Sequence, residues 1–207
     1  MEVMEFGFRE FQLHIIATMP ESPNRSTALE LLDAGERDVE DALSVARAIG
    51  LFRLGHQVDL ERSILGEEIY KVPLSESGDE ASGAYGDSDV LAFRLPAFPG
   101  FDYAINVASS GVVWGQRFVR EQGSPVPEVS GIHDLEPWGF VKAELEPLLR
   151  NKVVDDKFSF SETITGSLVL DNSRDVGRSV ALRFDFELLQ TVSIDSRLSG
   201  VANHLAI

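Results

Sequence analysis

The chain has 207 residues, no cysteine and a formal net charge of −16, from 34 acidic and 18 basic side chains. The lack of cysteine excludes disulfides, thiol nucleophiles and cysteine-ligated metals, and a chain of this length forms one domain without such staples. The acidic balance disfavours binding to nucleic-acid phosphates or anionic membranes, which depends on clustered lysine and arginine.

The basic residues divide unevenly between lysine and arginine. Four are lysines, at positions 71, 142, 152 and 157, and the other 14 are arginines. High carboxylate density with little lysine is typical of proteins in molar salt, where a Debye length of about 3 Å screens self-repulsion. A GC-rich genome combined with an ordinary acidic surface explains the same bias, so both interpretations stay open.

The N-terminus is acidic where a signal peptide is basic, beginning Met1-Glu2-Val3-Met4-Glu5. No segment approaches the ~20 apolar residues that span a bilayer. We therefore expect a soluble protein without membrane insertion, not secreted by a cleavable signal and present in the cytoplasm during assembly.

The segment from Phe6 to Met19 predicts the first strand. Its apolar residues alternate with period two from position 11 onward, and a shift of phase around Arg9-Glu10 indicates a β-bulge. His14 falls on the polar face of this strand, which predicts a surface histidine. Pro20 then ends the segment.

Residues 20–50 predict a helical insertion with two helices. Thr27 and Glu30 form a capping-box pattern for a first helix that stops at Gly35. The second helix is expected over residues 37–49, because apolar residues recur on one face at helical spacing.

The middle of the chain predicts further strands. Residues 51–72 stay undecided, with strand-like pieces at both ends, and residues 75–89 predict an acidic Gly/Ser loop. The turn-forming run Ser109-Ser110-Gly111 indicates a hairpin, and residues 121–139 a long connector. Residues 140–149 stay open between strand and short helix, with Pro147 unfavourable inside either. The strands expected here cover residues 90–95, 103–107 and 112–119.

The clearest pattern is a hairpin of two long strands near the C-terminus. Apolar and polar residues alternate over 158–170 and again over 180–188, on either side of a turn at 171–177. Strands this long span a barrel or bend between sheets, and Gly166 is the expected bend. We therefore predict one mainly-β domain over residues 1–207, a β-sandwich or single jelly-roll barrel.

The sequence contains no complete motif for catalysis, a cofactor or a metal, so we assign no catalytic, cofactor-binding or metal-ligating residue. The four histidines, at positions 14, 56, 133 and 204, are too far apart in sequence for a local metal motif. Ser130 beside His133-Asp134 lacks a nucleophile elbow, and turn chemistry explains it better. The run from Asp171 to Leu182 fails as a calcium loop, because Val176 stands in place of the glycine that such a loop needs.

The leading functional hypothesis is a structural or assembly protein. Such a subunit packs with copies of itself or other structural subunits, and the specific form of the hypothesis is a capsid or tail-associated virion component of a salt-adapted host. Phe98, Phe101 and Trp138, on turn-like connectors, are expected to anchor the subunit interface. The alternative is an enzyme or carbohydrate-binding domain with a dispersed acidic site. Its first candidate is Glu162, on an otherwise apolar strand face, unless an arginine such as Arg183 neutralises it.

Overall fold

The computed structural model describes residues 6–51, 55–73, 88–158, 160–170 and 178–194. For residues 73 and 155–158 it describes the backbone but not the side chains. The chain divides into two compact units, Met1–Glu121 and Gln122–Ile207, where the sequence led us to expect one domain. Each unit holds its own antiparallel sheet of four strands, so the boundary falls where the predicted connector begins.

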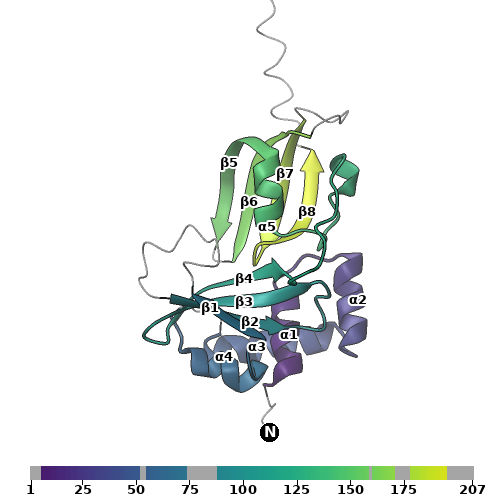
Figure 1. The fold of residues 1–207 in the computed structure, drawn as a ribbon. Helices are drawn as coiled ribbons and strands as arrows, with labels where there is room; N and C mark the ends of the chain where they lie inside the picture. Colours follow the sequence, from purple (N-terminus) through teal and green to yellow (C-terminus); the bar gives the residue numbers. More distant parts are fainter. Residues whose placement is uncertain (1–5, 52–54, 74–87, 159, 171–177, 195–207) are drawn as a thin grey trace, which may run out of the picture. The chain divides into compact units, whose positions relative to one another are not determined.

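Unit 1 begins with helices and ends with strands. In Figure 1, α1, α3 and α4 lie on one side of the sheet, whose strand order is β1-β2-β3-β4. The T-shaped contact of Phe11 with Tyr103, 5.4 Å between ring centroids, joins α1 to this face. The elements are α1 (Phe8–Ile16), α2 (Pro23–Leu31), α3 (Glu36–Ile49), α4 (Val58–Leu65), β1 (Tyr70–Pro73), β2 (Ser88–Arg94), β3 (Phe101–Ala108) and β4 (Val113–Arg120).

The strand predicted over Phe6 to Met19 is wrong, since this segment forms α1. Residues 11–16 are all buried, including the polar Gln12 and His14. The order of apolar and polar residues therefore shows no exposed face, and it cannot distinguish a helix from a strand. The expected bulge at Arg9-Glu10 disappears with the strand: Glu10 instead caps α1 by accepting a hydrogen bond from Gly7 N at 3.1 Å. His14, expected at the surface, is buried.

The two helices predicted within 20–50 are present, but the first begins earlier than expected. Ser22 is its N-cap, with Oγ accepting a hydrogen bond from Arg25 N at 3.1 Å, while Thr27 lies inside the helix. The second, α3, confirms the expected range and ends at Gly50, whose φ is 85°. Since α1 replaces the first strand, these helices precede the sheet.

The strands expected between residues 90 and 119 are confirmed as β2, β3 and β4. Gly111 closes the β3–β4 hairpin with φ 81°, the left-handed region that favours glycine. Phe98 and Phe101, expected to anchor an interface, are buried in unit 1 with 1% and 4% of their surface exposed. Phe98 packs on Phe118 at 4.5 Å between centroids, which places it in the core. Most of the predicted loop 75–89 lies outside the described residues.

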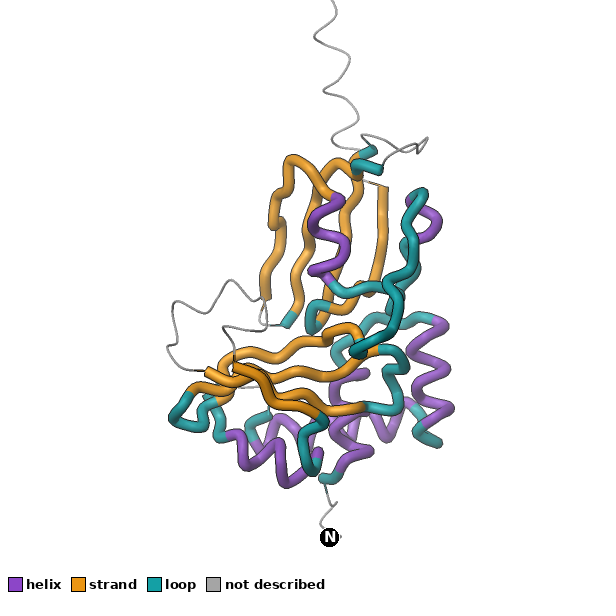
Figure 2. Tube along the Cα trace, viewed as in Figure 1, coloured by secondary structure: helices purple, strands orange, loops and turns teal. Residues whose placement is uncertain are grey.

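Unit 2 is a sheet in the order β5-β6-β7-β8 with one short helix, α5, against it (Figure 2). Its core gathers on the α5 side and includes Phe140, Leu145, Ile164, Leu182 and Phe184. The elements are η3 (Ile132–Asp134), α5 (Lys142–Leu145), η4 (Glu146–Leu148), β5 (Leu149–Phe158), β6 (Ser161–Leu168), β7 (Ser179–Asp185) and β8 (Leu188–Ile194). The open segment 140–149 is therefore mainly helical, and Pro147 lies in the first turn of η4.

The predicted C-terminal hairpin is confirmed, since β6 pairs with β7 in antiparallel orientation, but its two strands are shorter than predicted because each is interrupted. The first splits between β5 and β6, and the second ends at Phe186 and Glu187, which turn the chain with φ of 50° and 61°. Gly166 is no bend: it pairs with Val180 inside β6. A Cβ there would lie 3.1 Å from Arg150 O, so glycine permits the close approach of β5.

Two antiparallel sheets with a few helices confirm a mainly-β fold. The finer arrangement, a sandwich or jelly roll, stays a prediction.

Candidate functional site

Glu162, the carboxylate singled out in the sequence, lies on the α5-covered face of the unit 2 sheet. Lys142 Nζ, from the first residue of α5, is 2.7 Å from Glu162 Oε1. Burial alone lowers the pKa of Lys142, but the hydrogen bond to Glu162 and the charges of three nearby glutamates outweigh it, and the pKa is raised. The expected partner, Arg183, contacts Asp185 instead. Glu162 therefore fixes α5 to the sheet.

A second carboxylate, Asp185, lies close to Glu162 in the sheet but on the opposite face. Ser161 pairs with Asp185 and Glu162 with Phe184, and successive residues of a strand point to opposite sides. Burial raises the pKa of Asp185, against the opposing effects of Ser161 and Arg183. These two carboxylates do not converge on one substrate position.

We expect replacement of Glu162 by glutamine to cost about 1 kcal/mol of unfolding free energy, because the charge pair with Lys142 is mostly shielded from water. Chemical denaturation measures this loss. The matched control is Glu146→Gln, since the pair of Glu146 with Lys152 is exposed and contributes little. Equal effects of the two substitutions would contradict a structural role for Glu162.

Unit 1 contains a buried polar cluster, which we call the Glu61 cluster: Glu61, His56 and Gln116. Glu61 lies on α4 with none of its surface exposed, and its Oε1 accepts a hydrogen bond from Gln116 Nε2 on β4. His56 Nε2 is 3.0 Å from the same oxygen. Burial, and second the charge of Glu61, raise the pKa of Tyr103 well above its ordinary value. The cluster joins α4 to the sheet.

Sequence reasoning missed the Glu61 cluster because residues 51–72 stayed undecided. One signal was present: Glu61 follows Val58 by three residues, and both are the buried residues of α4. A carboxylate at an apolar helical position requires partners inside the core. Because Glu61 is fully enclosed, its carboxylate is shielded from solvent, and the cluster serves to hold α4 against the sheet.

The Ser130 segment forms a turn, as expected. Asp134 Oδ2 accepts hydrogen bonds from Ser130 Oγ at 2.7 Å, Ser130 N at 2.8 Å and Gly131 N at 2.9 Å. These bonds, the serine hydroxyl first, hold the pKa of Asp134 below its usual range. His133 lies 3.2 Å from the other carboxylate oxygen. The Asp134 carboxylate therefore caps the 3-10 turn η3, and the Ser130 hydroxyl donates to that carboxylate.

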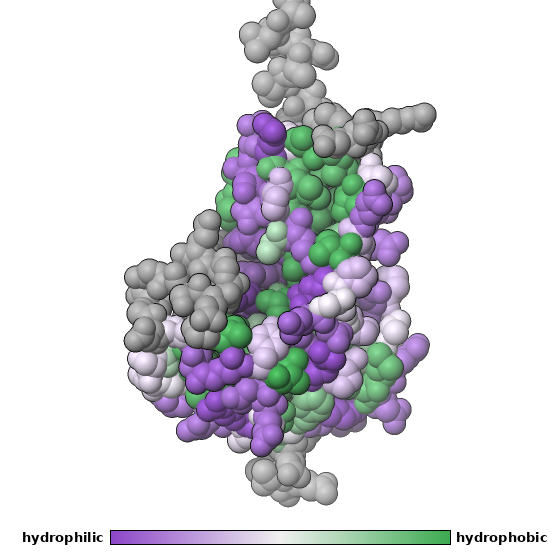
Figure 3. Space-filling view, viewed as in Figure 1, coloured by the Kyte–Doolittle hydropathy of each residue, from purple (hydrophilic) through white to green (hydrophobic). Residues whose placement is uncertain are grey.

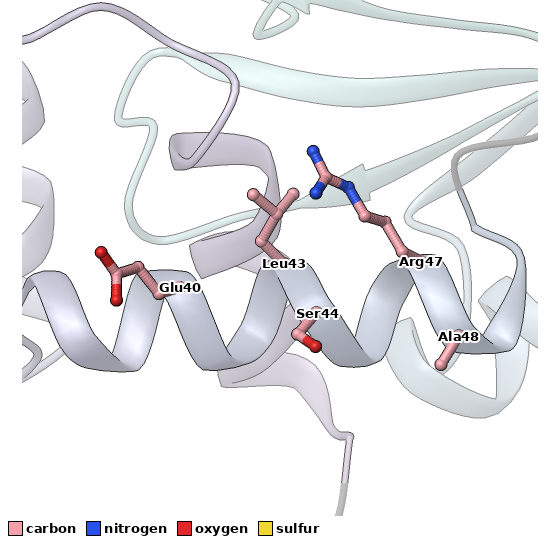
Figure 4. Close-up of a pocket in the computed structure, with 5 residues that line it drawn as sticks. All are labelled: Glu40, Leu43, Ser44, Arg47 and Ala48. Atoms are coloured by element: carbon pink, nitrogen blue, oxygen red, sulfur yellow. The ribbon is translucent and has the colours of Figure 1, made fainter.

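The remaining candidates offer little convergent chemistry. In the described residues no three histidine, aspartate or glutamate side chains gather as metal ligands. His204 and the loop 171–177 lie outside those residues. A surface depression lined by Glu40, Leu43, Ser44, Arg47 and Ala48 has α3 as its single wall (Figure 4).

The sheet edges differ in how they are covered. β1 has only four residues. The start of β4 is paired by residues 55–57, with Gly55 N donating to Val113 O at 2.7 Å. The start of β8 is paired by residues 138–141, with Trp138 N donating to Leu189 O at 2.7 Å. Trp138, an expected interface anchor, is half-buried there, and its indole donates to Gln190.

β5 is the long edge without such a cover. It has ten residues, and within the described parts of the chain nothing pairs with its outer side. Val153 and Val154 expose 54% and 52% of their surface, and Arg150, Asn151 and Lys152 are exposed as well. In Figure 3 hydrophobic residues reach the surface over the unit 2 sheet. This edge is the best candidate for a functional surface.

No helix in the described ranges combines the length and apolar character needed to cross a membrane. No family model, curated protein or solved structure matches the chain.

Proposed function

We propose that the chain is a structural or assembly protein, a subunit that packs with copies of itself or with other structural chains. The observation that carries this proposal is the outer edge of β5, ten residues long, with two adjacent valines more than half exposed. An unpaired strand edge presents backbone donors and acceptors that fit another strand, and exposed valines gain from burial.

The most specific form of the proposal is a capsid or tail-associated virion component of a salt-adapted host, with a β-sandwich or jelly-roll fold. The net charge of −16 with four lysines supports the salt adaptation. Jelly rolls serve capsids as well as lectins and enzymes, so the virion is reached by analogy of fold.

The enzyme or carbohydrate-binding alternative rested on Glu162. Because Glu162 forms an ion pair with Lys142 and Asp185 points to the other face of the sheet, we place this alternative second.

We expect the purified chain to associate in about 2 M salt and to dissociate in about 0.1 M salt. In about 0.1 M salt the Debye length is about 10 Å, so subunits of charge −16 repel one another. In molar salt the Debye length falls to about 3 Å or less, and the repulsion is screened. Sedimentation velocity at several protein concentrations measures the association. A monomer in both salts at the highest concentration would overturn self-assembly.

A further inference from the structure

We propose that β5 pairs with β5 of a second copy in antiparallel orientation, so that the two unit 2 sheets join edge to edge. This inference rests on the proposed function and deepens it by naming the partner and the surface. A twofold axis at the valine pair relates the copies, and each strand gives the other the same contacts.

The choice of β5 follows from the other edges. β1 is short, and β4 and β8 are paired at their starts by residues 55–57 and 138–141. Short or covered edges resist pairing with another chain. β5 combines length, an unpaired outer side among the described residues, and exposed apolar side chains at its middle.

The choice of a second copy follows from the order of charges along β5. Its sequence, LRNKVVDDKF, has two basic residues before the valine pair and two acidic residues directly after it. With the twofold axis at Val153 or at Val154, the basic part of each strand, before the valines, runs beside the acidic part of the other copy, after the valines. Neither register sets like charges directly opposite one another, whereas parallel, in-register pairing sets every charge beside its own kind.

The register shifts of β5 limit the length of the pairing. They fall between Arg150 and Val153 and between Val154 and Asp156, and Asn151 has φ 53°. Bulges twist an edge and shorten the stretch that another strand can follow. The contact therefore centres on the two valines, and we expect a reversible, concentration-dependent dimer that salt strengthens.

Charge at the twofold axis tests the interface. Val154→Lys brings two ammonium groups together there and removes apolar contact, so the dimer dissociation constant in about 2 M salt should rise at least about tenfold. Val154 is exposed, so the fold tolerates the change. The matched control is Ile194→Lys, at an equally exposed position on β8, which should dimerise like the parent chain.

Cysteine cross-linking gives a second readout, because the chain has no cysteine of its own. Val153→Cys or Val154→Cys places two thiols at the axis, and mild oxidation should yield a covalent dimer faster than Ile194→Cys does. If the parent chain associates but neither substitution on β5 behaves differently from its Ile194 control, the β5 pairing is overturned and the assembly function stands. A parent chain that stays monomeric overturns both.

Discussion

Replacing Glu61 by alanine is expected to lower the free energy of unfolding of unit 1 by about 3 kcal/mol. The carboxylate accepts from Gln116 Nε2 and lies 3.0 Å from His56 Nε2, so its removal takes a buried carboxylate oxygen away from both side chains. It also leaves a void between α4 and the sheet, since Glu61 has no exposed surface. Glu61→Gln retains an oxygen at the same place and should lose only about 1 kcal/mol.

Urea denaturation of the full chain measures these losses, and amide hydrogen exchange in β3 and β4 assigns them to unit 1. Glu40→Ala is the matched control, because Glu40 is an exposed glutamate on the neighbouring helix α3. An alanine variant at Glu61 as stable as the Glu40 control would show that the cluster contributes nothing to the fold.

The elements predicted well from the sequence are those with one buried face and a clear end. α3 has apolar residues on a single face and stops at Gly50, and the β3–β4 hairpin alternates around Gly111. In both, the local pattern and the tertiary environment agree. α1 failed for the opposite reason: its residues are buried all round, and an apolar run of that kind fits a strand as well as a helix.

The break at the end of β7 could not be predicted from the sequence, because it is stabilised by tertiary packing and not by turn-forming residues. Phe186 and Glu187 turn the chain at positive φ, where asparagine and glycine are the usual residues. Phe186 stacks on Phe160 at 4.7 Å between centroids and donates its backbone N–H to Phe160 O. This burial compensates the strained backbone, and no local pattern reveals such a contact.

The candidate surface was only partly accessible to sequence reasoning. An assembly role was expected, but its anchors were placed on Phe98 and Phe101, which the fold buries. Aromatic residues on turn-like connectors resemble surface anchors until the core is known. The β5 edge depends on strand order, which is set by pairing between distant segments and cannot be read from one strand.

The pH dependence of stability should carry a contribution from His14 of about 3 kcal/mol. Burial lowers the pKa of His14 from 6.5 to about 4, against a hydrogen bond to the backbone of Phe11 that acts to raise it. The folded pKa lies below the unfolded one, so protons favour the unfolded chain. Stability is therefore complete above pH 6.5 and falls as the pH drops toward 4. The rings of Phe6 and Phe11 form part of this apolar site, with centroids 6.1 and 4.8 Å from the centroid of the His14 ring.

Urea denaturation at constant salt, from pH 8 to pH 4, measures this contribution as a difference between variants. His14→Gln has no titrating group, so its curve should be flatter than that of the parent chain, and the gap between the two should change by about 3 kcal/mol over this range. The carboxylates of both proteins titrate alike and cancel in the difference. Parallel curves for His14→Gln and the parent chain would mean that His14 takes up its proton without unfolding α1.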